Sequence, residues 1–260
     1  MGRPAANPRV SFQTMFVDED MLVVAKPRGV VTQPGRGNTR NTLLNGVFAR
    51  WGAALTRLGE RRDFGLVHRL DRATSGLVVF GLTPEGYDGL RAAFAERRVE
   101  KRYLTVVRGR PPRSRGEARI RLLAVRRGDL RVSVRDPSGE EAVTRWRQVA
   151  WGSGRALLEC VIETGRLHQI RAHLAALGCP VEGDTVYGRG SDPDHRASTA
   201  RRADAAMLLH AWRLGIDHPR KGHRLRFESP LPEYFERALA GWGIQKIPTG
   251  WGNDGSGHGE

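Results

Sequence analysis

A short charged loop between two apolar runs is the feature that most constrains the fold of this chain. The loop carries one carboxylate, Asp71, between Arg69 and Arg72. The run 77–80 behind it is β-branched and aromatic, which is typical of a buried strand, and the run 64–67 ahead of it is also apolar. Because a carboxylate beside cations is favoured in its charged form, we expect an ionised acid in a turn next to a buried strand. The string Arg-Leu-Asp-Arg alone is equally typical of a salt-bridged surface turn.

The net charge of the chain predicts a polyanionic partner. Lys and Arg number 43 against 28 Asp and Glu, which gives a formal charge of +15. Such an excess indicates nucleic acid first and an anionic membrane second. No apolar run approaches the roughly 18 residues that span a bilayer, and residues 1–9 lack the apolar core of a signal peptide. We therefore expect a nucleic acid partner and no membrane.

Motifs for common cofactors and metals are missing from the sequence. It has neither a phosphate-binding loop of the Gly-Lys-Ser/Thr type nor a Gly-x-Gly-x-x-Gly string after a strand. His168 and His173 are five residues apart, which does not place them on one helix face as a zinc pair requires. Cys160 and Cys179 have apolar neighbours and no Cys-x-x-Cys partner, so they are expected to be inert core thiols in a reducing cytoplasm.

Short strand-like runs alternate with a few helical segments, a pattern that agrees with an α+β fold. Helices are expected near residues 42–51, from Pro84 onward, at 167–177 and at 232–239. Strands are expected at residues 21–25, 77–80, 103–107, 118–122, 130–135, 142–149, 156–162, 208–216 and 224–227.

A basic segment, residues 108–141, contains two stretches in which arginines alternate with apolar residues. A period of two indicates half-exposed strands. Arg119, Arg121 and Arg131 would then face solvent or a nucleic acid.

The expected helix at 167–177 carries a second candidate residue. Its apolar positions recur at helical spacing, so Arg171 and His168 share a different face. From there Arg171 could point into a cleft and form a two-bond pair with a carboxylate. A solvated basic helix face fits the spacing equally well. A third candidate, Tyr103, begins a strand, where a tyrosine is usually a core residue with its hydroxyl at the rim.

These strings resemble the RluA-type pseudouridine synthases, enzymes that isomerise uridine in RNA. Further matches follow the family's order over about residues 15–236. The strings that carry the resemblance are His-Arg-Leu-Asp-Arg-Ala-Thr-Ser-Gly-Leu at 68–77, Lys-Arg-Tyr at 101–103, Gly-Arg-Leu-His-Gln-Ile-Arg-Ala-His-Leu at 165–174 and Leu-His-Ala-Trp-Arg-Leu at 209–214.

The resemblance implies a fold, a reaction and site residues. The fold is α+β, with a mixed, mostly antiparallel sheet, flanking helices and a central active-site cleft. Asp71 would be the catalytic carboxylate, either as nucleophile on the ribose or as base toward its 2′ position. Arg171 would pair with it, and Tyr103 would lie against the target base. Isomerisation needs no activated water and hence no second carboxylate, and neither cofactor nor metal is implied.

The same resemblance suggests residues that handle RNA. The target uridine must leave its stack, and Arg69 would fill the vacated space. Arg72 is expected to contact RNA, and Leu214 to form part of the apolar wall around the base. Ribosomal RNA and transfer RNA both fit as partners, and the protein is expected to be a cytoplasmic monomer.

The expected organisation is a loose leader at 1–11, one catalytic domain at 12–248 and a disordered tail at 249–260. This leaves no room for the front RNA-binding domain of some relatives, so the domain's own arginines would bind RNA. They include Arg196, Arg201 and Arg202 of the loop 188–204. Two alternatives stay open: a catalytically silent RNA-binding or RNA-folding protein on the same scaffold, and a DNA-binding module, for which no recognition helix stands out.

Overall fold

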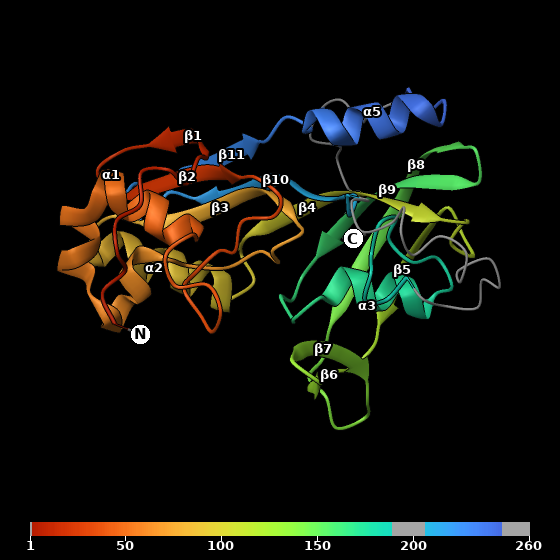
Figure 1. The fold of residues 1–260 in the computed structure, drawn as a ribbon, viewed down its shortest axis with the longest axis horizontal. Helices are drawn as coiled ribbons and strands as arrows, with labels where there is room; N and C mark the ends of the chain where they lie inside the picture. Colours follow the sequence, from red (N-terminus) through yellow and green to blue (C-terminus); the bar gives the residue numbers. More distant parts are fainter. Residues whose placement is uncertain (1, 189–205, 246–260) are drawn as a thin grey trace, which may run out of the picture.

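One long β-sheet is the central element of the fold (Figure 1). The structure, a computed structural model, describes residues 2–188 and 206–245. Within these residues nine strands run in the order β1-β2-β3-β10-β4-β9-β8-β5, with β11 beside β10. The strands are β1 Gln13–Val17, β2 Met21–Lys26, β3 Ser75–Gly81, β4 Glu100–Arg108, β5 Arg115–Arg119, β8 Val143–Gly152, β9 Arg155–Ile162, β10 Leu209–Asp217 and β11 Arg224–Glu228.

The sheet is mostly antiparallel, as the family resemblance implies. The exception among the described strand pairs is β3 with β10, which run parallel and pair Ser75 with His210. A separate hairpin of β6 (Leu122–Arg127) and β7 (Leu130–Arg135) stands off the sheet below α3 in Figure 1.

Helices cover both faces of the sheet. α1 (Leu43–Leu58), α2 (Pro84–Ala95) and α3 (Gln169–Ala176) lie on one side, and α5 (Glu233–Gly241) lies on the other (Figure 1). The two faces of strand β4 pack into two separate hydrophobic cores. Its alternate residues Tyr103 and Val107 pack into the core with the first three helices, whereas Leu104 and Val106 pack against α5. Because both faces are buried, the strand reads as a continuous apolar run.

Threonine caps begin the first two helices. The Thr42 hydroxyl oxygen accepts a hydrogen bond from the Asn45 amide, and the Thr42 amide donates one to Asn45 Oδ1, which completes a capping box. Thr83 caps α2, and Pro84 occupies its first turn, as the sequence predicts. α1 runs further than expected, to Leu58 through a kink at Trp51.

Some segments differ from the sequence expectations or lie outside the described residues. The 3₁₀ helix Glu60–Gly65 has no counterpart among the predicted elements. The leader, expected to be loose, is bonded to α1, since the Asn7 amide donates to the Asn45 carbonyl and the Asn45 side chain donates to the Ala5 carbonyl. The expected tail 249–260 and most of the loop 188–204, with Arg196, Arg201 and Arg202, lie outside the described residues.

Candidate active site

Three side chains from distant parts of the sequence line one small cavity. Asp71 comes from the loop before β3, Tyr103 from β4 and Arg171 from α3. The cavity, which we call the Asp71 cavity, has a volume of about 80 Å³. Arg69 also lines it. The fold thus brings together the three residues that the sequence singles out.

Arg171 binds two carboxylates at once. Its Nη1 donates to Asp71 Oδ2 over 2.9 Å, while its Nε and Nη2 donate to the two oxygens of Asp184 over 2.7 and 3.0 Å. The two-bond partner of the arginine is therefore Asp184, and Asp71 receives the one remaining donor. The Arg171 side chain is 7% exposed and that of Asp184 is 0% exposed, against 20% for Asp71.

Hydrogen bonds hold the buried pair in its charged form. Burial acts to raise the pKa of Asp184, but the bonds and charge of Arg171 and the amides of Tyr187 and Val186 outweigh it and lower that pKa. Burial likewise acts to lower the pKa of Arg171, and Asp184 followed by Asp71 raises it above its ordinary value. The arginine is thus a fixed cation beside Asp71.

His168 is a further neighbour of the acid. Its Nε2 lies 3.7 Å from Asp71 Oδ2. The residue precedes α3 with φ of 52°, in the left-handed region, so the helix begins at Gln169 rather than at the expected Leu167. Burial lowers the pKa of His168 although Asp71 opposes this. A neutral imidazole therefore stands at the cavity near neutral pH.

Backbone contacts fix the Asp71 loop from the side of β2. The Thr32 hydroxyl donates to the Leu70 carbonyl over 2.7 Å. The Gly29 amide donates to the Arg72 carbonyl over 2.7 Å, and the buried Lys26 ammonium lies 3.4 Å from the same oxygen. These bonds set the loop's conformation independently of the acid itself.

A glycine and a buried histidine anchor the strand that follows. Gly76 has φ of 113°, and a Cβ at this position would lie 2.2 Å from the Ala211 carbonyl oxygen, so a side chain is excluded where β3 meets β10. Beside it, Ser75 Oγ lies 2.8 Å from His210 Nδ1. Burial lowers the pKa of His210 to about 4, so this contact involves a neutral imidazole at neutral pH.

Tyr103 lines the same cavity as Asp71. It is 9% exposed. Burial raises the pKa of its hydroxyl, and the charge of Asp71 raises it further. The phenol is therefore neutral at any pH near neutrality, which leaves an aromatic face with a protonated hydroxyl beside the carboxylate.

The amino-acid sequence is similar to those of known enzymes that modify RNA. The family model "RNA pseudouridylate synthase" matches residues 20–176, more than half of the chain. Ribosomal large subunit pseudouridine synthase D of Zymomonas mobilis is 37% identical over 89% of this chain and 73% of its own length, and the protein of that name in Nitrosomonas europaea is 36% identical over 86% and 63%.

The chain belongs to the RNA pseudouridylate synthase family. Solved structures agree in fold: the human RNA pseudouridylate synthase domain containing proteins 4 and 1 superpose with TM-scores of 0.68 and 0.67, at 23% identity. They cover 88% and 92% of this chain, and 92% and 98% of their own. The mixed, mostly antiparallel sheet is thus that of the pseudouridylate synthase family.

Two residues expected to contact the RNA or its target base, Arg72 and Leu214, do not line the Asp71 cavity. The exposed Arg72 donates from Nε to the Gly29 carbonyl over 3.1 Å and does not line the Asp71 cavity. Leu214 does not line it either, since it packs in the core, opposite Lys101 on β4. Among the apolar side chains that do line the cavity is Leu209, five residues earlier on β10.

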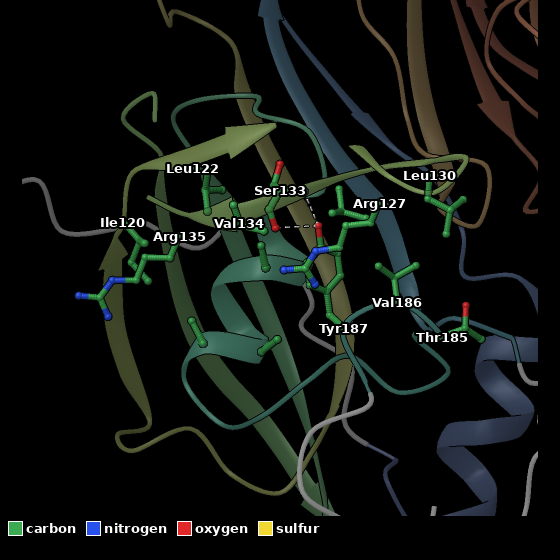
Figure 2. A pocket seen from close by; sticks show the side chains of 14 residues that line it. Ile120, Leu122, Arg127, Leu130, Ser133, Val134, Arg135, Thr185, Val186 and Tyr187 are labelled. Carbon is green, nitrogen blue, oxygen red and sulfur yellow. Dashed lines mark hydrogen bonds between the residues drawn. The ribbon is translucent and has the colours of Figure 1, made fainter. Parts of the chain in front are cut away.

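A larger hollow of about 650 Å³ lies under the β6–β7 hairpin (Figure 2). Tyr187 joins it to the site. The Ser133 amide donates to Tyr187 Oη over 2.7 Å, and Oη donates to the Ser133 carbonyl over 3.1 Å, as the dashed lines in Figure 2 mark. The same Oη lies 3.2 Å from His168 Nδ1, and the ring lies 5.2 Å from the Arg171 guanidinium carbon. The hairpin is therefore linked to the residues around Asp71.

Two other sets of side chains could carry chemistry: a cluster of possible metal ligands and the two cysteines. Asp18, Asp20 and His218 come within 4.8 Å of one another, but His218 Nε2 lies 2.7 Å from Asp18 Oδ2, and Arg220 pairs with Asp20 over 2.8 Å. The ligand atoms thus satisfy each other and their cationic neighbour. Both cysteines are buried, as predicted, and burial raises both thiol pKa values, that of Cys179 to about 11. Within the described ranges 2–188 and 206–245, no helix is both long and apolar enough to span a bilayer.

Proposed function

We propose that the protein isomerises uridine to pseudouridine in RNA, with Asp71 as the catalytic carboxylate. The observation that carries the proposal is the hydrogen bond of 2.9 Å from Arg171 Nη1 to Asp71 Oδ2 in the cavity that Tyr103 also lines. The fixed guanidinium holds one oxygen of this carboxylate and so orients the acid. In the described part of the chain, no hydrogen bond reaches its Oδ1, which is free to meet the ribose.

The reaction is an isomerisation in which every atom is retained. The bond from C1′ to N1 of uracil breaks, the base turns, a bond forms from C1′ to C5, C5 loses its proton, and N1 gains one, either directly or by exchange with solvent. Asp71 either attacks C1′ and is later displaced or removes and returns the 2′ proton. Both routes need one ionised acid. Tyr103 supports the turning base with its ring.

Access to the cavity requires that the uridine leave its stack. Arg69 is exposed and lines the cavity that holds Asp71. A planar guanidinium stacks well on neighbouring bases. We therefore assign Arg69 to the space that the uridine vacates, while Arg72 supports the loop through Gly29.

We infer that the substrate is large-subunit ribosomal RNA. Support comes from the names of the relatives in Zymomonas mobilis and Nitrosomonas europaea, and from the formal charge of +15. Transfer RNA is the other substrate that the sequence allows. The cytoplasmic location and the monomeric state stay predictions from the sequence.

The test is to incubate the purified protein with transcripts of large-subunit ribosomal RNA and, separately, of transfer RNA, and to map pseudouridine in each. We expect modification at one or a few uridines of the ribosomal RNA. Modification of transfer RNA alone would overturn the substrate. RNA binding without pseudouridine in either pool would overturn the activity and favour a silent RNA-binding or RNA-folding protein.

A further inference from the structure

A second hollow of about 440 Å³ adjoins the Asp71 cavity. The two share Arg69, Tyr103 and Ile162 among their lining residues, so they form neighbouring parts of one cleft. The walls of this second hollow come from the end of α2, the start of β4 and the segment after β9. We call it the Lys101 cavity.

Cations dominate the Lys101 cavity. Its lining includes one carboxylate, that of Glu163, which forms an ion pair with Arg145 over 2.5 Å. His68 adds no charge, because burial lowers its pKa to about 3 and its Nε2 accepts the Val79 amide. The cationic residues in the lining are Arg69, Arg91, Arg97, Lys101 and Arg166.

Lys101 is 8% exposed. In the described part of the chain its Nζ bonds to no acceptor, and Nζ keeps some contact with solvent, since it is not one of the fully buried atoms that lack a hydrogen bond. In the ranges that the structure describes, its contact of note is the Phe94 ring, whose centroid lies 5.7 Å from Nζ. The other buried lysine, Lys26, shows the usual arrangement, because its ammonium lies within 3.4 Å of three carbonyl oxygens. Lys101 therefore differs from a lysine that the fold satisfies internally.

This burial is unfavourable for the protein alone. A charged group taken from water costs free energy unless it is paired and hydrogen-bonded. Burial lowers the pKa of Lys101 to about 8, and the charge of Arg97 contributes in the same direction. An anion in the cavity would offset both causes.

We propose that the Lys101 cavity is a subsite for a phosphodiester group of the RNA strand next to the flipped uridine, with Lys101 as its central cation. This proposal rests on the proposed function. A strand that delivers a nucleotide to Asp71 must carry a phosphate on each side of that nucleotide, and the adjoining cavity lies beside Asp71. Lysine binds phosphate as a compact point charge, and arginine as a planar fork. Both kinds of cation line this wall.

Loss of one phosphate contact has a measurable signature. For single strands the slope of log affinity against log salt falls by about 0.7 per contact. We expect Lys101→Gln to lower the slope by about 0.7 and Lys101→Arg to restore it. Lys221→Gln, at a side chain that is 55% exposed, is the matched control and should leave the slope unchanged. An unchanged slope in Lys101→Gln would overturn the proposal.

Thermal unfolding separates binding from a structural role. Lys101→Gln removes a buried charge without an acceptor, so its melting temperature should equal or exceed that of the wild type. A lower melting temperature together with an unchanged salt slope would show that Lys101 serves the fold alone. The binding assay is run in the Asp71→Asn background, where no turnover occurs. If the wild-type protein forms no pseudouridine but Lys101→Gln still lowers the salt slope of RNA binding, only the proposed function fails. If pseudouridine forms but Lys101→Gln leaves the salt slope unchanged, only the phosphate subsite fails.

A direct probe distinguishes RNA from free phosphate. The chain has four lysines, Lys26, Lys101, Lys221 and Lys246, so a ¹³C-lysine spectrum is simple, and Lys101→Gln identifies the signal. A short oligouridine should raise the pKa of Lys101 from about 8 toward the ordinary value of an exposed lysine. Inorganic phosphate at matched ionic strength should do so only at far higher concentration. An equal response to inorganic phosphate, or no response to RNA, would overturn the assignment to the strand.

Discussion

Arg171 and Asp184 form a buried two-bond pair, with distances of 2.7 and 3.0 Å. The pair fixes the guanidinium so that Nη1 reaches Asp71 Oδ2 over 2.9 Å. Asp184 thus acts on Asp71 through the arginine. In the described residues the bonded oxygen of Asp71 is Oδ2, so the acid is held on one side and open on the other.

Asp184→Asn should destabilise the protein and slow turnover. The amide cannot accept two bonds from Arg171, and breaking a buried pair costs about 3 kcal/mol of unfolding free energy. The misplaced guanidinium should lower turnover by about 10²-fold, with RNA affinity retained. Denaturant unfolding and single-turnover assays measure the two effects. Asp88→Asn, in an exposed pair with Arg62, is the control and should change neither.

The stability difference between wild type and Asp184→Asn should depend on pH. Folding lowers the pKa of Asp184 below its ordinary value of 3.8. Such a group contributes its stability above the unfolded pKa and loses it as pH falls through the folded pKa. The difference in unfolding free energy should therefore be full above about pH 4 and shrink at lower pH. A difference that grows on acidification would contradict this account of the pair.

Arg171→Lys should impair catalysis less than loss of the acid does. A lysine keeps the charge but cannot bind Asp184 with two donors while a third reaches Asp71. We expect a loss of about 10²-fold in single-turnover rate. Arg237→Lys on the exposed face of α5 is the control. Wild-type activity in Arg171→Lys would show that charge alone suffices and that the forked geometry is dispensable.

Tyr103 should act chiefly through its ring. Base stacking on an aromatic side chain contributes about 1–3 kcal/mol, so Tyr103→Ala should lower kcat/KM by about 10–100-fold, and Tyr103→Phe by less than about 10-fold. Because the pKa of the hydroxyl is raised, the pH–rate profiles of wild type and Tyr103→Phe should have the same shape up to about pH 9. A phenylalanine variant as impaired as the alanine variant would assign the chemistry to the hydroxyl.

The β6–β7 hairpin offers the sharpest test of the basic segment. Arg126 and Arg131 lie directly opposite each other, and like charges in that position destabilise a strand pair. Both are exposed, with no carboxylate in ion-pair contact among the residues of the described ranges. Arg119 instead pairs with Glu117 and Glu141.

Replacement of Arg126 and Arg131 by Gln should lower the salt slope of RNA binding by about 1.4, at about 0.7 per contact. The melting temperature should stay equal or rise, since the repulsion across the hairpin is removed. Arg119→Gln is the matched control and should change the slope less. An equal slope in the double variant and the wild type would mean that the hairpin faces solvent in the complex.

The sequence predicted much of the sheet because its strands are buried on both faces. Runs such as Leu77–Phe80 are apolar at every position, and that signal is local. The hydrophobic pattern alone does not give the bounds of the edge strand β1, because its residues are half-exposed and show neither a clear alternation nor an apolar run. The bonds from residues of the leader to Asn45 could not be predicted for a similar reason, since they leave no trace in hydrophobic periodicity.

Some residues of the candidate site could likewise be predicted from the sequence, and others could not. Asp71, Tyr103 and Arg171 stood out in strings that resemble a known family, and the fold places them in one cavity. The partner Asp184 was not predicted, because its pairing depends on how the chain after α3 folds back onto that helix. Lys101 could have been found from its place beside Tyr103, but its lack of an acceptor is a property of packing alone.

Asp71→Asn tests the central claim most directly. The amide is nearly the same size, so we expect an unchanged melting temperature and RNA affinity within about threefold of the wild type. Pseudouridine formation in large-subunit ribosomal RNA under single-turnover conditions should fall at least about 10³-fold, because the one carboxylate of the reaction is lost. Pseudouridine at a rate near that of the wild type, from a purified variant free of wild-type protein, would contradict the account.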